Sequence, residues 1–306
     1  MHMIELLSKK RFKAIIFDWD GTAVPDRFSS AEYLKEPFHQ LLKLGIKIVI
    51  ITGTNINNVW RQVGPWLDRD LAYNLYFCTN RGSEVFQWKD GDFITLERRV
   101  ATSEEEDKLN RIAETFKNEV KIKYNLDVDI IYNRLNRRKI DLIPLPEWAD
   151  PPKSKIDELL IAVNKRLKDH NVPSLSYLIK RTKEISFEIG LKDPRITSDV
   201  KHIEVGLTDK SDSTKFVREK LGVLPEEMLI LGDEFGPIGE VDGSDYLMLN
   251  KYTKGATFIS VGKEPNGVPK EVIHIGGGPE KFVEILWEVI KKEGELNNVG
   301  NSAGKF

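Results

Sequence analysis

The chain has 306 residues, of which 40% are hydrophobic and 31% are charged, and its formal net charge at pH 7 is −2. A chain of this length is typical of two domains of ~150 residues, each large enough to bury a core. The balanced charge lacks the basic surplus that is typical of proteins that bind nucleic acid, so we expect no nucleic-acid partner.

The sequence also bears on the cellular compartment. Cys78 is the single cysteine and cannot form an intramolecular disulfide, which favours a reducing cytoplasm. Its apolar neighbours predict a core residue without chemistry. No apolar run approaches the ~20 residues of a membrane span, and residues 1–5 do not resemble a signal peptide. We therefore expect a cytoplasmic location and no membrane partner, while the oligomeric state stays open.

The first part of the chain alternates predicted strands and helices. Short aliphatic runs at residues 13–17, 46–51 and 75–78 are typical of buried strands. Apolar residues at helical spacing predict one helix at 31–44 and a second after Asn55, which could cap it. This βαβαβ order indicates a parallel sheet.

The pattern changes in the middle of the chain. Here we expect, in chain order, a helix from residue 103, strands at 128–132 and 139–143, a helix at 154–167, and strands at 176–179 and 185–189. This αββαββ order predicts an α+β domain rather than a continuation of the parallel sheet.

The α/β alternation returns near residue 202. We expect strands at 202–205, 228–231, 245–249 and 256–261, helices at 211–221 and 280–290, and a tail without regular structure from about residue 293. The predicted fold class is therefore α/β, with a doubly wound, mostly parallel core of residues 1–82 and 203–306. A smaller α+β domain of residues 83–202 is inserted in this core.

Two carboxylates follow the first predicted strand. Asp18 and Asp20 are separated by one residue, and Gly21 lets the chain turn away from the strand. Because ligands of open α/β sheets bind beyond the carboxyl ends of the strands, both side chains can reach one site. Asp18 could then attack a phosphate, with Asp20 as general acid and base. A cation must offset the repulsion between the two anions, and hard oxygen ligands favour Mg²⁺. A plain surface turn is the alternative interpretation.

Other polar groups follow further predicted strands or precede helices. The hydroxyl of Thr52 and the N–H groups of Gly53 and Thr54 could hold a phosphoryl oxygen, although Thr52 could also be an ordinary helix cap. Lys210 could neutralise developing charge on a phosphoryl group, or it could be a solvated lysine. Asp233 could complete a magnesium site or belong to a turn.

Together these residues resemble the haloacid dehalogenase superfamily of phosphatases and phosphomutases. The resemblance covers most of the chain. Its nucleophile motif, Asp-x-Asp-Gly-Thr, is matched at residues 18–22, and its other three motifs are matched at Thr52, at Lys210 and at Gly232-Asp233. The resemblance implies that Asp18, Asp20 and Asp233 bind the metal. Asp245 is the expected further ligand and Asp242 the alternative, because the second acid comes later than is usual in the family.

The inserted domain resembles the cap of the sugar phosphatases and phosphomannomutase. Asn80 lies in a turn similar to that subgroup's Asn-Gly turn, and Arg137, Arg138 and Lys139 match a strand that grips the substrate's distal phosphate. A basic hairpin turn in solvent is the alternative for these three. Thr54 departs from the family, in which many members carry arginine after Thr-Gly.

The resemblance therefore implies a Mg²⁺-dependent phosphatase that forms an aspartyl phosphate on Asp18. We expect its substrate to be a small phosphorylated metabolite, in particular a sugar phosphate. One alternative is a phosphomutase of the phosphomannomutase type. Another is a catalytically weak protein that binds phosphosugars.

Overall fold

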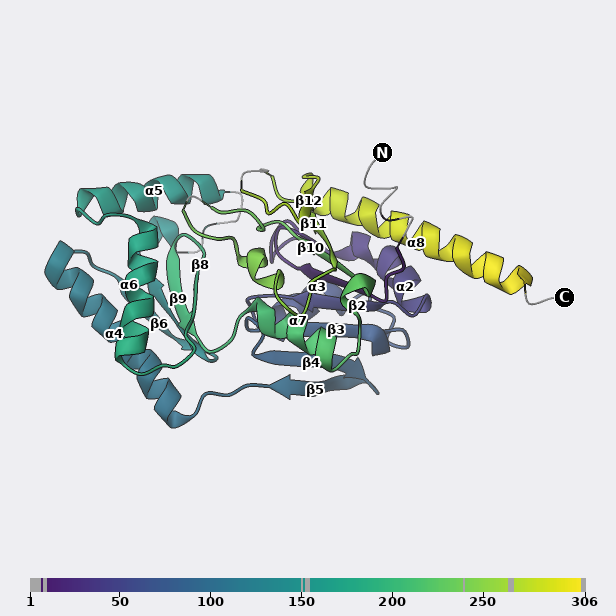
Figure 1. The fold of residues 1–306 in the computed structure, drawn as a ribbon, viewed down its shortest axis with the longest axis horizontal. Helices are drawn as coiled ribbons and strands as arrows, with labels where there is room; N and C mark the ends of the chain where they lie inside the picture. The colour runs from purple at the N-terminus through teal and green to yellow at the C-terminus, as the bar shows by residue number, and fades with distance from the viewer. Residues whose placement is uncertain are drawn as a thin grey trace. The chain divides into compact units, whose positions relative to one another are not determined.

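A computed structural model describes residues 7, 10–149, 151, 155–238, 240–263 and 267–303, with side chains up to residue 295. The chain forms two compact units (Figure 1). The larger unit consists of Met1–Arg98, Lys210–Phe235 and Met248–Phe306, and the smaller unit of Arg99–Asp209 and Gly236–Leu247. Within the described residues, none of the helices has both the length and the apolar character needed to cross a membrane.

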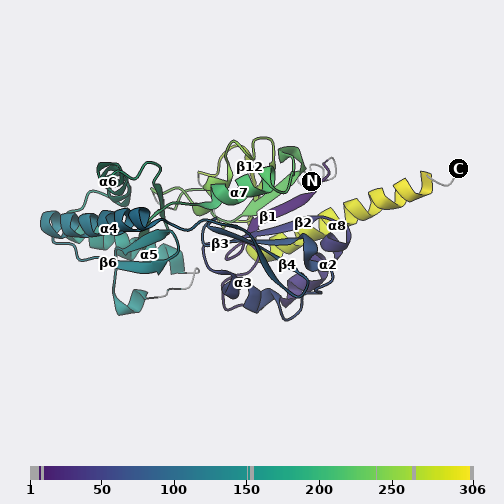
Figure 2. The ribbon, with the colours of Figure 1, turned by 90° about the horizontal axis from the view of Figure 1, so that it is seen from below.

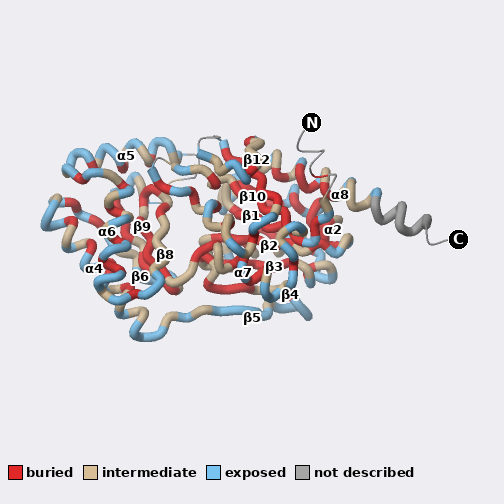
Figure 3. Tube along the Cα trace, in the orientation of Figure 1, coloured by how far each residue is buried: buried red, intermediate tan, exposed pale blue. Residues whose placement is uncertain are grey.

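The larger unit contains an eight-stranded sheet in the order β12-β11-β10-β1-β2-β3-β4-β5. Its strands are β1 (Ala14–Asp18), β2 (Lys47–Ile51), β3 (Leu75–Thr79), β4 (Glu84–Lys89), β5 (Asp92–Arg98), β10 (Met228–Gly232), β11 (Thr257–Ser260) and β12 (Val272–His274). Neighbours from β12 to β3 pair in parallel, whereas β4 and β5 are antiparallel. Figure 3 shows that the edge strand β5 is exposed over most of its length.

Helices cover both faces of this sheet. The side chains of β1 alternate, so that Ile15 and Phe17 join one core and Ala14 and Ile16 the other. The first core is closed by α2 (Lys35–Lys43), α3 (Ile56–Val63) and α8 (Gly278–Ala303), and the second by α7 (Lys210–Glu219). Figure 2 shows these two layers of helices on opposite sides of the strands. The prediction of a doubly wound, mostly parallel α/β core is confirmed.

The smaller unit packs helices on one face of an antiparallel sheet. The strands are β6 (Asp129–Arg134), β7 (Arg137–Asp141), β8 (Arg195–Ser198) and β9 (His202–Gly206), in the order β6-β7-β9-β8. The helices are α4 (Ser103–Tyr124), α5 (Ile156–Asp169) and α6 (Leu175–Glu188). Their apolar faces form one core with the alternate residues Ile140, Ile203 and Val205 of the sheet. An α+β unit is therefore present, as predicted.

Short 3₁₀ helices occur in both units, at Glu32–Leu34, Ala72–Asn74, Pro146–Trp148, Pro225–Glu227 and Ser244–Met248. The last of these replaces the strand predicted at 245–249.

The predicted αββαββ order is wrong after α5. Residues 176–179 and 185–189 are not strands, because α6 runs through Leu175–Glu188. Ser174 caps this helix by accepting a hydrogen bond from the N–H of Tyr177 at 3.0 Å. The apolar residues of α6 face the core at helical spacing, so packing in the unit decides its structure. The order observed is α4-β6-β7-α5-α6-β8-β9.

Other boundaries also differ from the predicted ones. The β4–β5 hairpin lies in the core sheet, whereas β9 pairs in the small sheet, so the units divide at residues 98 and 209 rather than at 82 and 203. The hairpin turns at Asp90-Gly91, where both residues have positive φ, which is a strong hairpin signal in sequence. The tail predicted from residue 293 is helical to Ala303, because α8 continues.

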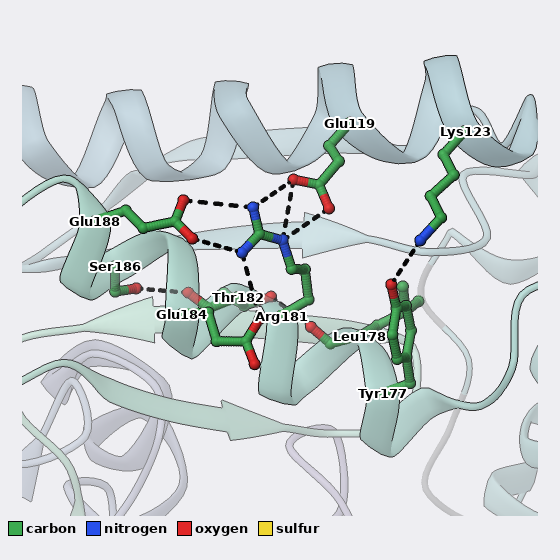
Figure 4. Close-up of polar contacts among 9 residues, drawn as sticks. All are labelled: Glu119, Lys123, Tyr177, Leu178, Arg181, Thr182, Glu184, Ser186 and Glu188. Atoms are coloured by element: carbon green, nitrogen blue, oxygen red, sulfur yellow. Dashed lines mark hydrogen bonds and ion pairs between the residues drawn. The ribbon is translucent and has the colours of Figure 1, made fainter.

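A network of charges joins α4 to α6 in the smaller unit (Figure 4). The guanidinium of Arg181 on α6 donates two hydrogen bonds of 2.7 Å to the two carboxylate oxygens of Glu119 on α4. Arg181 also pairs with Glu184 and Glu188 on its own helix. Its hydrogen bonds hold the pKa of Glu119 below the usual value. These contacts add a polar connection to the apolar packing of the two helices.

This network predicts a pH-dependent effect of Arg181→Met. A carboxyl group whose pKa is lowered on folding stabilises the folded state above its unfolded pKa of ~4.3, and this contribution disappears as pH falls through the folded pKa. We expect the variant to be ~1 kcal/mol less stable than the wild type at pH 7, and the difference to shrink as pH falls below ~4.3 and through the lowered pKa of Glu119. Urea unfolding across this range measures it, with Lys183→Met on the exposed side of α6 as the control. A difference independent of pH would contradict the prediction.

Candidate active site

Asp18 ends the central strand β1. All five residues of this strand are buried, and Asp18 pairs in register with Ile51 of β2. Strand β1 ends at Asp18, although the N–H of the next residue, Trp19, still donates to the carbonyl of Ile51 at 3.2 Å. The carboxylate of Asp18 therefore lies at the carboxyl edge of the parallel sheet, where ligands of such folds bind.

The segment after Asp18 folds into a tight loop. Gly21 has a φ of +92°, a conformation that residues with a side chain rarely adopt. Its N–H donates to the carbonyl of Val24 at 2.6 Å, and the N–H of Ala23 donates to the carbonyl of Trp19 at 3.0 Å. Asp20, which lies in this loop, is half-buried. The acid–base role predicted for Asp20 stays a prediction.

Lys210 binds Asp18 directly. Lys210 is the first residue of α7, and its Nζ donates to Oδ1 of Asp18 at 2.7 Å. The two side chains are only 3% and 10% exposed. The alternative of a solvated lysine is therefore wrong. A buried ammonium beside a carboxylate offers positive charge to an anionic ligand.

Asp233 lies close to Asp18. It follows the buried strand β10, which pairs with β1. A carboxylate oxygen of Asp233 lies within 4.8 Å of one of Asp18, near enough for both to bind one ion. Thr22, which is fully buried, donates its hydroxyl to Oδ1 of Asp233 at 2.9 Å. Thr22 was not among the predicted site residues, although its place in the Asp-x-Asp-Gly-Thr motif could have indicated a role.

Thr52 follows β2, and its backbone is fixed by the neighbouring strand. Its N–H donates to the carbonyl of Cys78 at 2.9 Å, and its buried hydroxyl accepts from the N–H of Thr54 at 3.2 Å. Asn55, not Thr52, caps α3, because its side chain accepts from the N–H of Asn58. The prediction for Asn55 is confirmed, and the helix-cap alternative for Thr52 is wrong.

Cys78 is fully buried as predicted, and burial raises the pKa of its thiol to about 12.

The turn after β3 is bound to this same loop. Asn80 and Arg81 both have positive φ, and their N–H groups donate to the carbonyls of Thr54 and Thr52 at 2.8 and 3.2 Å. The side chain of Asn80 donates to Glu84 at 2.6 Å. Arg81 itself was not among the predicted site residues, although it stands beside Asn80 in the turn that the resemblance identifies.

Asp245 and Asp242 belong to the segment of the smaller unit that follows β10. Within this segment Ile238 and Val241 pack in the core of the smaller unit, and Glu240 accepts a hydrogen bond from Ser176 at 2.8 Å. The residues that separate Asp233 from Asp242 and Asp245 in the sequence thus include ones that pack in the smaller unit. Asp245 is fully buried, whereas Asp242 is exposed.

The three basic residues of β7 lie on two faces of the small sheet. Arg138 faces α4, where it forms an ion pair with Glu106 and donates to Asn110 at 2.7 Å. Arg137 and Lys139 lie on the face without helices, where both pair with Glu204, at 3.4 and 3.1 Å. Because these side chains are largely buried and paired, a hairpin turn in solvent is the wrong interpretation.

Comparison with known proteins assigns the family. Residues 15–236 match the model of the haloacid dehalogenase-like hydrolases, so the chain belongs to this family. The prediction of a hydrolase with this fold is confirmed. A search of curated proteins finds no match.

Solved structures share the fold at low sequence identity. Plasmodium falciparum IMP-nucleotidase, bound to IMP, superposes with a TM-score of 0.62 and 11% identity, over 94% of this chain and 70% of the other. Aspergillus fumigatus trehalose-6-phosphate phosphatase gives a TM-score of 0.58 and 13% identity, over 94% and 96% of the two chains. At this level the likeness establishes the fold.

The Lys210–Asp18 pair predicts a coupled effect on stability. Lys210→Met removes the ammonium next to a buried carboxylate and should destabilise the protein by ~3 kcal/mol. In the double variant Asp18→Asn/Lys210→Met the carboxylate is neutral, so the loss should be smaller than the sum of the two single losses by ~1–3 kcal/mol. Urea unfolding of the four proteins measures this coupling. Additive losses would show that the 2.7 Å contact carries no net interaction.

Proposed function

We propose that the protein is a phosphomonoester hydrolase in which Asp18 is the nucleophile. The observation that carries the proposal is the position of Asp18: a largely buried carboxylate at the edge of the sheet, paired with Lys210 at 2.7 Å and within 4.8 Å of Asp233. A binding site for a phosphate anion needs the ammonium, but it has no need of two neighbouring carboxylates. Their presence favours a nucleophile together with a metal ligand.

The reaction proceeds in two displacements on phosphorus. An oxygen of Asp18 forms a bond to phosphorus while the ester bond breaks, and Asp20 gives its proton to the leaving oxygen. Asp20 then takes a proton from water, whose oxygen attacks the aspartyl phosphate and releases phosphate and the Asp18 carboxylate. Lys210, the hydroxyl of Thr52 and the N–H of Gly53 bind the phosphoryl oxygens as charge develops on them. The N–H of Thr54, which was predicted to bind there too, donates instead to the Thr52 hydroxyl at 3.2 Å and so orients it.

The carboxylates fit a magnesium ion as cofactor. Asp18 and Asp233 offer hard oxygen donors close to each other, and Thr22 orients the carboxylate of Asp233. We propose Asp245, which is buried, as a further ligand in preference to the exposed Asp242. Asp20, also predicted as a ligand, is kept for proton transfer, because a carboxylate that binds the metal cannot carry the proton that it must donate. When bound, Mg²⁺ offsets the repulsion between the Asp18 carboxylate and the phosphate dianion.

We propose a sugar phosphate as substrate, with the smaller unit as the cap that selects it. Arg137 and Lys139 share the sheet face without helices and can turn from Glu204 to an anionic group. Asn80 stays in the proposed set, whereas the partners of Arg138 on α4 lead us to give it a structural role. Likeness to a trehalose-6-phosphate phosphatase supports this substrate class, and likeness to an IMP-nucleotidase makes nucleoside monophosphates the comparison class. We propose a cytoplasmic location on the strength of the single cysteine.

The central test uses a panel of sugar phosphates and nucleoside monophosphates with Mg²⁺. We expect release of inorganic phosphate, and a loss of kcat by ~10⁴-fold or more in Asp18→Asn. Asp90→Asn, in the exposed turn between β4 and β5, is the matched control, because asparagine accepts its positive φ. An isomerised sugar phosphate without free phosphate would instead identify a mutase. Binding without turnover would identify a binding protein.

The role of Thr22 can be measured without turnover. Thr22→Val keeps the shape of the side chain but removes the hydrogen bond to Asp233, so the affinity for Mg²⁺ should fall by ~10-fold. Isothermal titration of the two proteins with Mg²⁺ checks this, and Thr95→Val on the exposed edge strand is the control. Equal affinity in Thr22→Val and the wild type would refute the proposed role of Thr22 in orienting Asp233 for the metal.

A further inference from the structure

The turn at Asn80-Arg81-Gly82 places an arginine next to the loop proposed to bind phosphate. The three residues have φ values of 49°, 53° and 81°. Such a left-handed conformation is readily adopted by glycine but costs ~1 kcal/mol or more at a residue with a long side chain. Arginine therefore occupies a position where the backbone conformation favours glycine or asparagine. Positions of this kind are found where a side chain is needed for function.

The backbone of the turn is fixed from both sides. The N–H of Asn80 donates to the carbonyl of Thr54 at 2.8 Å, and that of Arg81 donates to the carbonyl of Thr52 at 3.2 Å. The Asn80 side chain is held in addition by Glu84, which pairs with Arg98 at 3.1 Å. These contacts set the direction in which the side chain of Arg81 leaves the turn.

The Arg81 side chain runs along Gly53. A Cβ added to Gly53 would lie 3.8 Å from both Cγ and Nε of Arg81 and 3.9 Å from its Cζ. The guanidinium is thus beside the residue whose N–H, together with the Thr52 hydroxyl, is proposed to bind a phosphoryl oxygen. Arg81 is only 9% exposed, so water screens its charge little at this place.

We propose that Arg81 is a phosphate-binding residue whose guanidinium binds two oxygens of the transferred phosphoryl group beside Thr52 and Gly53. A planar guanidinium matches two phosphoryl oxygens and can form paired hydrogen bonds, which the single ammonium of Lys210 cannot do. The attraction between the guanidinium of Arg81 and the phosphoryl group is strongest when the phosphoryl oxygens carry the greatest negative charge. The inference rests on the proposed function for the identity of the anion, but it is tested separately from it.

The test replaces Arg81 with glycine and with lysine. Because glycine adopts positive φ without steric cost, Arg81→Gly keeps the turn and should melt close to the wild type. The same variant should bind inorganic phosphate, in the presence of Mg²⁺, at least ~10-fold more weakly, and its kcat/KM should fall by ~100-fold. Arg81→Lys should recover only part of this loss, since lysine retains the positive charge but not the planar set of N–H donors that can bind two oxygens at once. Added guanidinium chloride should partly restore turnover in Arg81→Gly.

Arg61→Gln is the control, because its exposed guanidinium binds the carbonyl of Arg27. Phosphate affinity is measured by isothermal titration, also in Asp18→Asn, so it does not depend on turnover. The inference fails if Arg81→Gly binds phosphate as tightly as the wild type, or if it melts lower and guanidinium restores nothing. A wild type that binds phosphate through Arg81 but hydrolyses none of the panel would refute the proposed function and leave this inference standing.

Discussion

The proposed chemistry depends on a buried pair of opposite charges between the first strand and a helix that is far away in the sequence. Asp18 and Lys210 are joined at 2.7 Å, and both are nearly inaccessible to solvent. Burying either charge alone would cost several kcal/mol, so each charge offsets part of the free-energy cost of burying the other. The doubly wound fold makes the pair possible, since it brings the end of β1 and the start of α7 to the same edge of the sheet.

Backbone hydrogen bonds organise the rest of that edge. The loops after β1, β2 and β3 are tied in series: Trp19 to Ile51, Thr52 to Cys78, and Arg81 back to Thr52. Side-chain positions at one loop therefore depend on the strand beside it as well as on the loop's own sequence. Such rigid support is what a site needs when its donors must be in place before charge develops on the substrate.

Residues that follow buried strands could be predicted from the sequence, because a parallel sheet collects strand ends at one edge. Asp18, Thr52 and Asp233 are of this kind, and the structure places each directly at such an end. Partners across the sheet, such as Thr22 for Asp233, could not be derived because they depend on distances between loops.

Local patterns failed where packing decides the structure. Ile185, Phe187 and Ile189 alternate as in a strand, yet in α6 Ile185 is buried and Phe187 is 53% exposed. The sequence does not distinguish the three basic residues of β7. Because side chains alternate along a strand, Arg138 lies on the face of the small sheet that packs against the helices, and Arg137 and Lys139 lie on the other face. The packing of residues 236–238 and 240–247 in the smaller unit had no signal in the sequence beyond the unusual number of residues between Asp233 and Asp245.

The central claim is that Asp18 becomes covalently bonded to phosphorus during turnover. Rapid acid quenching during hydrolysis of a substrate, followed by reduction with borohydride, converts an aspartyl phosphate to homoserine, which peptide mass spectrometry can locate. If Asp18 is the nucleophile, homoserine should appear at position 18. Modification at another residue, or steady turnover without any modified residue, would contradict it.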